Sequence, residues 1–404
     1  MAPDLGTYLT TATRWLRRNA PADRAVRDIH DVAVFHTLCY EEELHILKKL
    51  RAWQRAKFQA GYAAISWPLE LHGAGLPATY ADGFKAAEAA EVSLTRHELV
   101  SMTLNLIAPT VRLYGSAELK ARVFPGMHNG DLLACQLFSE PEAGSDLAAV
   151  ATRAVRDGGD WVLNGQKVWT SGAQFAEWGQ ALVRTDPAAA KHAGLTALMV
   201  PMDAPGVEVR PIKQMSGGTS FNEVLLHDVR VPDAYRMGAP GEGWKVTRAT
   251  LAFERANASN KAGVGGQFDQ LVDLARRTNS WEHRDIRQRL ADVYLRERAA
   301  EVSLARERRA RETGEPPGAA GSMRKVQWVE KLRAVSDLAT EMLGSGIVAD
   351  SGRPGEFSWT AHVLGAPGYR IAGGSDQIQR TIVAERHLGL PAEPKTGPKR
   401  TDAQ

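Results

Sequence analysis

The chain has 404 residues, 44% of them hydrophobic, which is enough for two or three domains with substantial cores. Its 50 lysine and arginine residues nearly balance 47 acidic residues, so the net charge is only +3. A nucleic-acid-binding protein would normally carry a concentrated basic stripe, and the most basic run, residues 306–311, is interleaved with glutamates. That run is typical of a solvated helix face, and we expect no nucleic-acid partner.

The two cysteines, Cys39 and Cys135, are too few for a disulfide framework and favour a reducing compartment. Residues 1–20 lack the apolar segment of a secretory signal, and no apolar run approaches the length that spans a bilayer. We therefore expect a cytoplasmic protein without a membrane span.

Residues 1–130 are predicted to be mainly helical. The apolar residues of 41–58 recur every three positions, as on one face of a helix: Leu44, Leu47, Leu50 and Trp53. Proline and glycine predict a loop over residues 67–77. Helical composition resumes over residues 83–100.

From residue 131 the sequence favours strands. Two β-prone runs in residues 161–170 flank Asn164-Gly165, a pair that predicts a two-residue hairpin turn. Further short strands are predicted at 196–202, 206–212 and 222–232. Short strands with proline and glycine turns are typical of a small barrel or sandwich.

Helical periodicity returns after residue 246 and continues to about residue 390, with one Pro/Gly loop at 314–322. The predicted plan is an α+β multidomain chain without internal repeats. Its parts are an α-helical domain at 1–130, a β-barrel-like domain at 131–240, a helical domain at 241–390 and a disordered tail at 391–404.

The motifs of several enzyme classes are missing. No Rossmann fingerprint follows a predicted strand, and there is no P-loop, H-E-x-x-H or G-x-S-x-G motif. One E-x-x-H pair is present, Glu42 and His45, whereas a carboxylate di-iron site needs two such pairs. We therefore expect no metal site.

Two segments point to a bound ligand. In 135-CQLFSEPEAGSDLA-148, small residues around Gly144 favour a tight, nearly bare turn, and Ser139 and Ser145 place hydroxyls beside backbone N–H groups. Such a run of donors suits an anion or a polar ring edge, although an ordinary surface turn has the same composition. The second segment, residues 164–178, presents an aromatic wall and two hydroxyls: Trp169, Thr170 and Ser171.

Together these segments resemble the acyl-CoA dehydrogenase family, whose flavin-binding strands read E-P-x-A-G-S-D and then N-G-x-K-x-W-I-T-N. The resemblance covers nearly the whole chain, because further family motifs are matched in order at 67–76, 226–232, 240–244 and 373–389. It implies the family's fold, an α-helical domain, a central β-domain and a C-terminal four-helix bundle. FAD would lie between the last two, usually at a subunit contact.

The resemblance also implies a reaction and partners. An acyl-CoA thioester would be dehydrogenated between its α and β carbons, and an electron-transfer flavoprotein would accept the electrons. The chain would form a homo-oligomer (dimer or tetramer) or a heteromer with a related subunit. The residues assigned to FAD are Phe138, Ser139, Gly144, Ser145, Trp169, Thr170, Ser171, Gly344, Ser375 and Gln377. Those assigned to substrate are Ser145, Arg255 and Gly374.

The reaction needs a carboxylate that removes the α-proton. In many family members it is the glutamate of E-G-T-x-Q-I-Q-R, and the matching position here is Gly373. A minority carries the glutamate on an upstream helix just before an arginine, which matches Glu254 and Arg255. On a helix, Glu254 shares a small, largely apolar face with five residues, where a carboxylate would be poorly solvated. They are Thr247, Thr250, Leu251, Ala258 and Ala262. We predict that Glu254 is the base.

Gly373 keeps a role in the resemblance, because the backbone N–H at this position helps to polarise the thioester carbonyl. Glycine also leaves volume beside the flavin, which predicts room for a branched or bulky acyl group. Asp376 is predicted to cap the last helix, with Gln379 completing a capping box.

Two segments depart from the family pattern, residues 273–283 and 341–347, and both belong to the part that reaches a neighbouring subunit's flavin. They leave three alternatives to the dehydrogenase open. One is an acyl-CoA oxidase, another is a non-catalytic or flavin-sharing subunit of a heteromeric dehydrogenase, and the third is a flavin monooxygenase on the same fold. The retained acyl-CoA motifs disfavour the monooxygenase.

Overall fold

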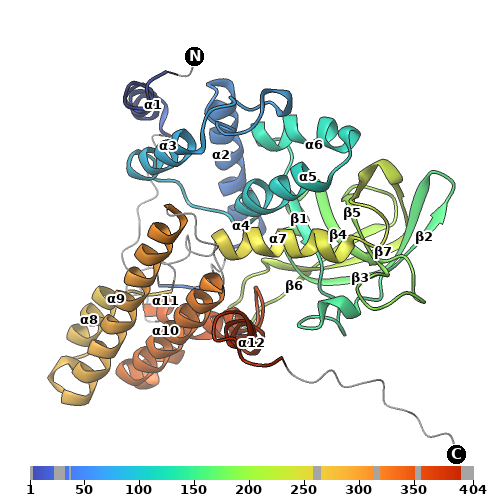
Figure 1. Ribbon diagram of the computed structural model, residues 1–404. Coiled ribbons are helices and arrows are strands. Elements are labelled where there is room, and N and C mark those ends of the chain that lie inside the picture. The colour runs from blue at the N-terminus through green and yellow to red at the C-terminus, as the bar shows by residue number, and fades with distance from the viewer. Residues whose placement is uncertain are drawn as a thin grey trace, which may run out of the picture. The chain divides into compact units, whose positions relative to one another are not determined.

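The computed structural model describes residues 3–21, 32–35, 38–257, 265–312, 319–350 and 356–392 (Figure 1). The chain divides into two compact units. The first ends at Asn257, and the second contains the residues from 258 on together with residues 32–34.

The first unit begins with helices. Their bounds are α1 Leu5–Asn19, α2 Tyr40–Gln59, α3 Ala78–Glu91, α4 Glu98–Met102, α5 Ala108–Tyr114 and α6 Ala117–Asn129. Side-chain caps define two of the starts. The Asp4 carboxylate accepts a hydrogen bond from Thr7 N at 3.1 Å before α1, and the Ser116 hydroxyl accepts one from Leu119 N at 3.0 Å before α6. Gly130, with φ of 84°, then ends α6 in the left-handed conformation that glycine adopts without strain.

The prediction of continuous helix over residues 83–100 is wrong, because the structure has two helices separated by an extended segment. α3 ends at Glu91 because Val92 is extended, and α4 starts only at Glu98. His97 caps α4, since its Nδ1 accepts a hydrogen bond from Leu99 N at 3.2 Å. A π-helical turn, Thr103–Ile107, then joins α4 to α5. Such turns occur often near functional sites.

An eight-stranded sheet follows, as predicted for this part of the chain. The strands are β1 Ala134–Leu137, β2 Arg153–Asp157, β3 Asp160–Ser171, β4 Trp178–Arg184, β5 Leu195–Pro201, β6 Val207–Ile212, β7 Phe221–Pro232 and β8 Arg236–Met237. Their order is β6-β7-β3-β2-β4-β5-β8, and β1 pairs with β4 in parallel. Figure 1 shows this sheet strongly curved, with α5 and α7 beside it.

The hairpin predicted at Asn164-Gly165 is wrong. Both residues lie inside the continuous strand β3, and the turn between β2 and β3 is Gly158–Gly159. Asn164 instead faces a bulge in β7, where His227 and Asp228 stand opposite this one residue, and the Asn164 amide donates to the Asp228 carboxylate at 2.9 Å. A Cβ at Gly165 would lie 2.7 Å from Thr152 Cα, so close backbone approach explains this glycine.

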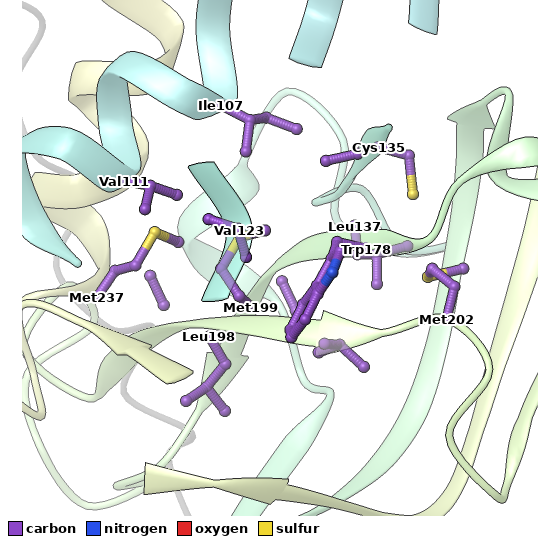
Figure 2. Packing of buried hydrophobic residues seen from close by; sticks show 14 of the residues in the cluster. Ile107, Val111, Val123, Cys135, Leu137, Trp178, Leu198, Met199, Met202 and Met237 are labelled. Atoms are coloured by element: carbon purple, nitrogen blue, oxygen red, sulfur yellow. The ribbon is translucent and has the colours of Figure 1, made fainter. Parts of the chain in front are cut away.

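Buried residues of α1 and α3 form a separate cluster, whereas helices α4 to α6 and the sheet of the first unit share one hydrophobic core. Trp178, at the start of β4, is 5% exposed and lies within it. Figure 2 shows Trp178 beside Leu137 of β1, while Ile107 and Val111 come from the helical segments. The N-terminal helical domain and the β-domain are therefore packed as one body.

Asp233, directly after β7, fastens one end of the sheet. Its carboxylate accepts hydrogen bonds from Arg236 Nε at 2.8 Å and from Trp161 Nε1 at 2.7 Å, and Arg156 Nη1 lies at 2.8 Å. The bond from Arg236 is the largest of the causes that lower the pKa of Asp233 from 3.8 to about 2.

We expect Asp233→Asn to lower the free energy of unfolding by about 1–2 kcal/mol at pH 7. The folded carboxyl ionises near pH 2 and the unfolded one near 3.8, each pH unit between them corresponds to about 1.36 kcal/mol, and solvent at this quarter-exposed side chain reduces the total. Because the folded-state pKa is lowered, this contribution is complete above about pH 4 and is lost as pH falls towards 2.

Urea unfolding at pH 7 and at steps from pH 4 to 2 measures this dependence. Asp157→Asn is the control, because its ion pair with Arg230 is exposed (62% and 56%) and should contribute little. A difference between wild type and Asp233→Asn that persisted unchanged below pH 2 would contradict the assignment.

Helix α7, Gly243–Asn257, closes the first unit, and the second unit contributes α8 Phe268–Arg277, α9 Arg284–Glu312, α10 Ala320–Leu343, α11 Glu356–Gly365 and α12 Asp376–Arg386. Trp359 of α11 is 1% exposed in the core of the second unit. His362 joins residues 32–34 to this unit, because its Nδ1 lies 3.1 Å from Val32 O and its Nε2 lies 3.3 Å from Leu332 O. Burial lowers the pKa of His362 to about 4, so the ring is neutral at pH 7.

None of the helices within the described ranges is long and apolar enough to cross a membrane. No group of three or more metal-ligating side chains gathers among the described residues. From residue 393 on, the predicted tail at 391–404 lies outside the described residues, as does most of the loop predicted at 314–322.

Candidate functional site

The two motif segments lie side by side in the first unit. Ser139 follows β1, and its carbonyl accepts a hydrogen bond from Val168 N of β3 at 2.9 Å. Glu140 and Ala143 then exchange two backbone hydrogen bonds of 3.0 Å. This closes the tight turn that the sequence predicted.

The turn leaves its backbone open to solvent. Ser139 is half-buried, and Gly144 and Ser145 are exposed. No heavy atom of the described residues outside its own neighbours lies within 4 Å of the place where a Cβ on Gly144 would stand. Phe138, by contrast, is 7% exposed, so a ligand on this surface could meet its backbone rather than its ring.

Strand β3 is strained where it meets this turn. Trp169 is 59% exposed and has φ of 61°, in the left-handed region that a residue with a Cβ adopts at a cost of about 1–2 kcal/mol. The pairing of β3 with β7 shifts between Lys167 and Thr170, which marks an irregularity of the ladder at this point. Strain of this kind persists only where surrounding contacts impose it, and it gathers at binding sites.

Successive side chains of β3 differ in burial beside Trp169, as expected for a strand whose side chains point to opposite faces in turn. Thr170 is 1% exposed, whereas Ser171 is half-buried and Trp169 is exposed. A ligand lying on the outer surface would therefore meet the backbone of Thr170, not its hydroxyl. Of the two hydroxyls that the sequence suggested beside Trp169, that of Thr170 is therefore buried in the protein.

Inside the protein, a polar cluster holds Thr170. Asn222 Nδ2 donates to Thr170 O at 3.1 Å and also contacts Gln174 Oε1. Gln174 Nε2 in turn donates to Glu43 Oε2 at 3.3 Å. Glu43 lies on α2, is 6% exposed, and has a pKa that burial raises.

Sequence reasoning missed Glu43 because it stands in a run of three glutamates that reads as solvated. The available signal was its spacing, since Glu43 lies four residues before Leu47, which is 1% exposed on the same helix face. His97 faces the same carboxylate, with Nε2 4.0 Å from Glu43 Oε1. Burial lowers the pKa of His97 to about 4, so the pair carries no histidine charge at pH 7.

The predicted base lies on α7. Thr250 Oγ1 accepts a hydrogen bond from Gln180 Nε2 of β4 at 2.8 Å and lies 3.1 Å from Thr110 Oγ1 of α5. Thr247 and Thr250 are fully buried. Glu254 follows Thr250 by four residues on the same face and is half-buried.

The part of the predicted face that precedes Glu254 on α7 is therefore buried, at Thr247 and Thr250. Leu251 is half-buried. Ala258 and Ala262 lie outside the described residues, as does the side chain of Arg255.

In the second unit, side chains on both sides fix the Gly-Gly turn before α12. Gly373 and Gly374 have φ of 67° and 90°, which favour glycine. Gln379 Nε2 donates to Gly373 O at 2.9 Å, and Lys325 Nζ of α10 donates to Gly374 O at 3.1 Å. Among the described residues, no hydrogen bond uses the backbone N–H of the exposed Gly373.

The predicted capping box is wrong. Ser375, not Asp376, is the N-cap of α12, and its hydroxyl accepts a hydrogen bond from Ile378 N at 3.4 Å. The Asp376 carboxylate instead accepts a hydrogen bond from Arg370 Nε at 2.9 Å, and the Gln379 amide donates one to Gly373 O. The side chains of Asp376 and Gln379 thus stabilise the turn before α12 and do not cap the helix.

The remaining predicted FAD residues of the second unit are at the surface. Gln377 is exposed on the first turn of α12. Gly344 is exposed at the end of α10, with φ of 52°.

Three family models match consecutive parts of the chain. The acyl-CoA dehydrogenase N-terminal domain matches residues 25–131, the middle domain 135–229 and the C-terminal domain 241–388. Acyl-CoA dehydrogenase IpdE1 of Mycobacterium tuberculosis is 38% identical over 358 residues, which cover 87% of this chain and 91% of that protein. The chain belongs to the acyl-CoA dehydrogenase family. It has the family's three-part fold, a helical N-terminal domain, a middle β-domain and a helical C-terminal domain.

Solved structures of the family share this architecture. A steroid acyl-CoA dehydrogenase, Tcur3481-Tcur3483, aligns with a TM-score of 0.73 at 27% identity and covers 97% of this chain and 99% of its own. The ChsE4-ChsE5 complex of Mycobacterium tuberculosis aligns with a TM-score of 0.69 at 26% identity, covering 97% and 98%. Membership makes the chain an oxidoreductase of acyl-CoA thioesters and a flavoprotein with FAD as its cofactor.

The residues of the first unit fit this cofactor. The surface around Ser139, Gly144 and Ser145 offers hydroxyls and a backbone turn with open space where a side chain would stand. Beside it the exposed Trp169 offers an aromatic face. Polar donors next to an aromatic face are suited to a flavin, which has polar ring edges and a flat π-system.

Replacing Trp169 separates strain from binding. We expect Trp169→Gly to be more stable than Trp169→Ala by about 1 kcal/mol, because glycine adopts φ of 61° freely and alanine does not. Both variants should bind FAD more weakly than wild type, because both lack the aromatic face.

Urea unfolding of the apoproteins and titration with FAD measure the two effects. Equal stability of the glycine and alanine variants would argue against a strained Trp169 in solution. FAD affinity equal to that of wild type would argue against its place in the flavin site.

Proposed function

We propose that this chain is a catalytically competent acyl-CoA dehydrogenase in which Glu254 removes the α-proton of the thioester. The observation that carries the proposal is the position of Glu254 on the buried face of α7, next to the fully buried Thr250. A half-buried carboxylate on a rigid helix is suited to general-base catalysis. The alternative position, Gly373, has no side chain, and its φ of 67° disfavours one.

When bound, FAD would supply the hydride acceptor for the β-hydrogen. The chain's own groups would do the rest. The Glu254 carboxylate takes the α-proton, and the Gly373 N–H donates a hydrogen bond to the thioester oxygen as negative charge develops on it. Arg255, Ser145 and Gly374 would contact the CoA part of the substrate. Phe138 and Thr170 would contribute backbone groups to FAD, and Gly344, Ser375 and Gln377 are proposed as further FAD contacts.

For the substrate we propose a branched or bulky acyl group. Gly373 leaves unfilled the volume that a glutamate occupies in many relatives, which supports a wider pocket. A structural neighbour described as a steroid acyl-CoA dehydrogenase, similar over 97% of this chain, supports the same conclusion. A large ring system attached to the acyl chain is thus the first substrate class to test.

Assembly and electron transfer are proposed on the same basis. Neighbours that are complexes of two different chains, such as ChsE4-ChsE5, support a heteromer of this chain with a related subunit. An electron-transfer flavoprotein is the proposed acceptor. We propose a cytoplasmic location, which agrees with two free cysteines in the described residues.

The test is anaerobic reduction of the flavin by substrate. The purified protein should be yellow, and a CoA thioester with a bulky ring-bearing acyl group should bleach it faster than straight-chain thioesters of equal length. Bleaching confined to straight-chain thioesters would contradict the proposed pocket. A colourless chain that gains FAD and activity only with a second chain would favour a flavin-sharing subunit, and fast reoxidation by oxygen would favour an oxidase.

A further inference from the structure

An ion pair between Glu140 and Lys167 is buried between the two candidate FAD segments. Lys167 Nζ lies 2.7 Å from Glu140 Oε1, and the two side chains are 0% and 8% exposed. Glu140 belongs to the turn that carries Gly144 and Ser145, and Lys167 precedes the strained Trp169 by two residues. Neither member of the pair reaches the outer surface, so neither can touch FAD or substrate directly there.

The lysine ammonium has a complete set of acceptors. Besides Glu140, Lys167 Nζ donates to Phe138 O at 3.1 Å and to Leu182 O at 2.6 Å. An ammonium has three N–H donors, and all three are used. Lys167 therefore joins the end of β1, the turn after it and the middle of β4 to its own strand β3.

The glutamate is equally committed. Glu140 accepts hydrogen bonds from Ala151 N at 2.6 Å and from Thr152 N at 2.9 Å, in the segment that leads into β2. Burial opposes the ionisation of Glu140, but the Lys167 ammonium and these hydrogen bonds outweigh it and lower its pKa. Burial lowers the pKa of Lys167 to about 8, and Glu140 opposes this, so both members are charged at pH 7.

Stability alone is a poor reason for such a pair. Desolvating two charges costs several kcal/mol per ion, and apolar residues of similar volume often stabilise a fold as well or better. What the pair provides is geometry, because the hydrogen bonds from Lys167 to Glu140 and Phe138 O fix the turn relative to β3 near the strained Trp169. Three further hydrogen bonds join the pair to β4 and to the segment before β2. Binding surfaces keep their shape when supporting side chains are fixed in this way.

We propose that Glu140 and Lys167 are a positioning pair that holds the Ser139–Ser145 turn against the Trp169 strand and so preforms one FAD-binding surface. The pair acts through the backbone of these segments, not by touching FAD. The inference rests on the proposed assignment of both segments to FAD.

Two variants and one control separate positioning from stability. Lys167→Met leaves Glu140 charged and unpaired in the interior, so both stability and FAD affinity should fall, the affinity at least tenfold. Glu140→Gln combined with Lys167→Met removes the unpaired charge, so stability should recover towards wild type. The FAD affinity of this double variant should stay at least tenfold weaker, because Phe138 O and Leu182 O have lost their donor.

Lys57→Met is the matched control. Lys57 Nζ lies 2.9 Å from Glu88 Oε1, with 14% and 23% exposure, in the N-terminal helices. Its loss should reduce stability while leaving the FAD dissociation constant within twofold of wild type. Unfolding free energies of the apoproteins and FAD titrations give both numbers for every variant.

Hydrogen exchange provides a readout that needs no FAD. In the double variant, the amides of 138–145 and 167–171 should exchange faster than in wild type, with the rest of the chain unchanged. Wild-type FAD affinity, or unchanged exchange in both segments, would overturn the proposal. If wild type binds FAD but acyl-CoA thioesters do not reduce it, the proposed catalysis fails while the positioning role stands. If wild type binds FAD only with a second chain, the titrations are made on that complex and the exchange on this chain.

Discussion

Glu254→Gln should slow flavin reduction by acyl-CoA about 1,000-fold while FAD stays bound. A positioned general base contributes roughly 100- to 10,000-fold, and the amide that replaces the carboxylate has the same shape but takes no proton. The flavin absorbance of the variant checks that the site is intact. Single-turnover bleaching under anaerobic conditions measures the loss.

Glu242→Gln is the control for this experiment. Glu242 lies just before α7, is 39% exposed and pairs with Lys245 at 3.0 Å, so its substitution should leave the rate within twofold. Reduction of Glu254→Gln at the wild-type rate would show that another residue is the base. The glutamate of the last-helix motif could not be that other base, because glycine occupies its position at residue 373.

Trp178→Ala should lower the free energy of unfolding by about 4 kcal/mol, the largest stability effect that we expect from one substitution in the first unit. Tryptophan removed from a core costs about 3–5 kcal/mol, and Trp178 is 5% exposed among residues from both helices and strands (Figure 2). Because that core is shared, the helical and β signals should lose stability together. Urea unfolding followed by circular dichroism and by hydrogen exchange of both domains measures this.

Trp169→Ala is the matched control, since the same side chain is lost from a site that is 59% exposed. Its cost should be below about 1 kcal/mol. If Trp178→Ala loosened only the sheet, with exchange in α5 and α6 unchanged, the two domains would not form one cooperative body.

We propose that this chain, which has Gly373 where many relatives have the glutamate, takes its base from a different element. The backbone turn at Gly373 is preserved by Gln379 and Lys325, which fix its carbonyls and leave its N–H exposed. The proposed base, Glu254, lies on α7, and Thr250 of the same helix forms hydrogen bonds with Gln180 of β4 and Thr110 of α5. In this proposal, the donor to the thioester oxygen and the group that removes the α-proton would belong to separate elements.

The sequence by itself determined the order of helices, strands and helices, because that order is written in local periodicity. It also identified the two motif segments, because their glycine, serine and tryptophan residues can be recognised without knowing the tertiary structure. The turn at Glu140–Ala143 and the strands at 196–202, 206–212 and 222–232 follow from these local signals, and the structure contains them.

Other features depended on which segments meet in space, and no local pattern encodes that. Asn164-Gly165 has the composition of a hairpin turn, yet close approach of Thr152 places Gly165 inside a strand. Asp376 could have capped α12, but Arg370 lies near enough to take its carboxylate. In the sequence Glu43 resembles a surface charge, but in the structure it is buried and joined through Gln174 and Asn222 to the strand that carries Thr170.

The Glu140–Lys167 pair is the sharpest case. In the sequence these are two charged residues 27 positions apart, and each would be expected at the surface. Only the tertiary structure brings them together, because β1, β3 and β4 surround both side chains and leave them no other partner of opposite charge in the described part of the chain. Local sequence patterns indicated the residues that we propose to face the ligand, and long-range packing determined which residues hold those segments in place.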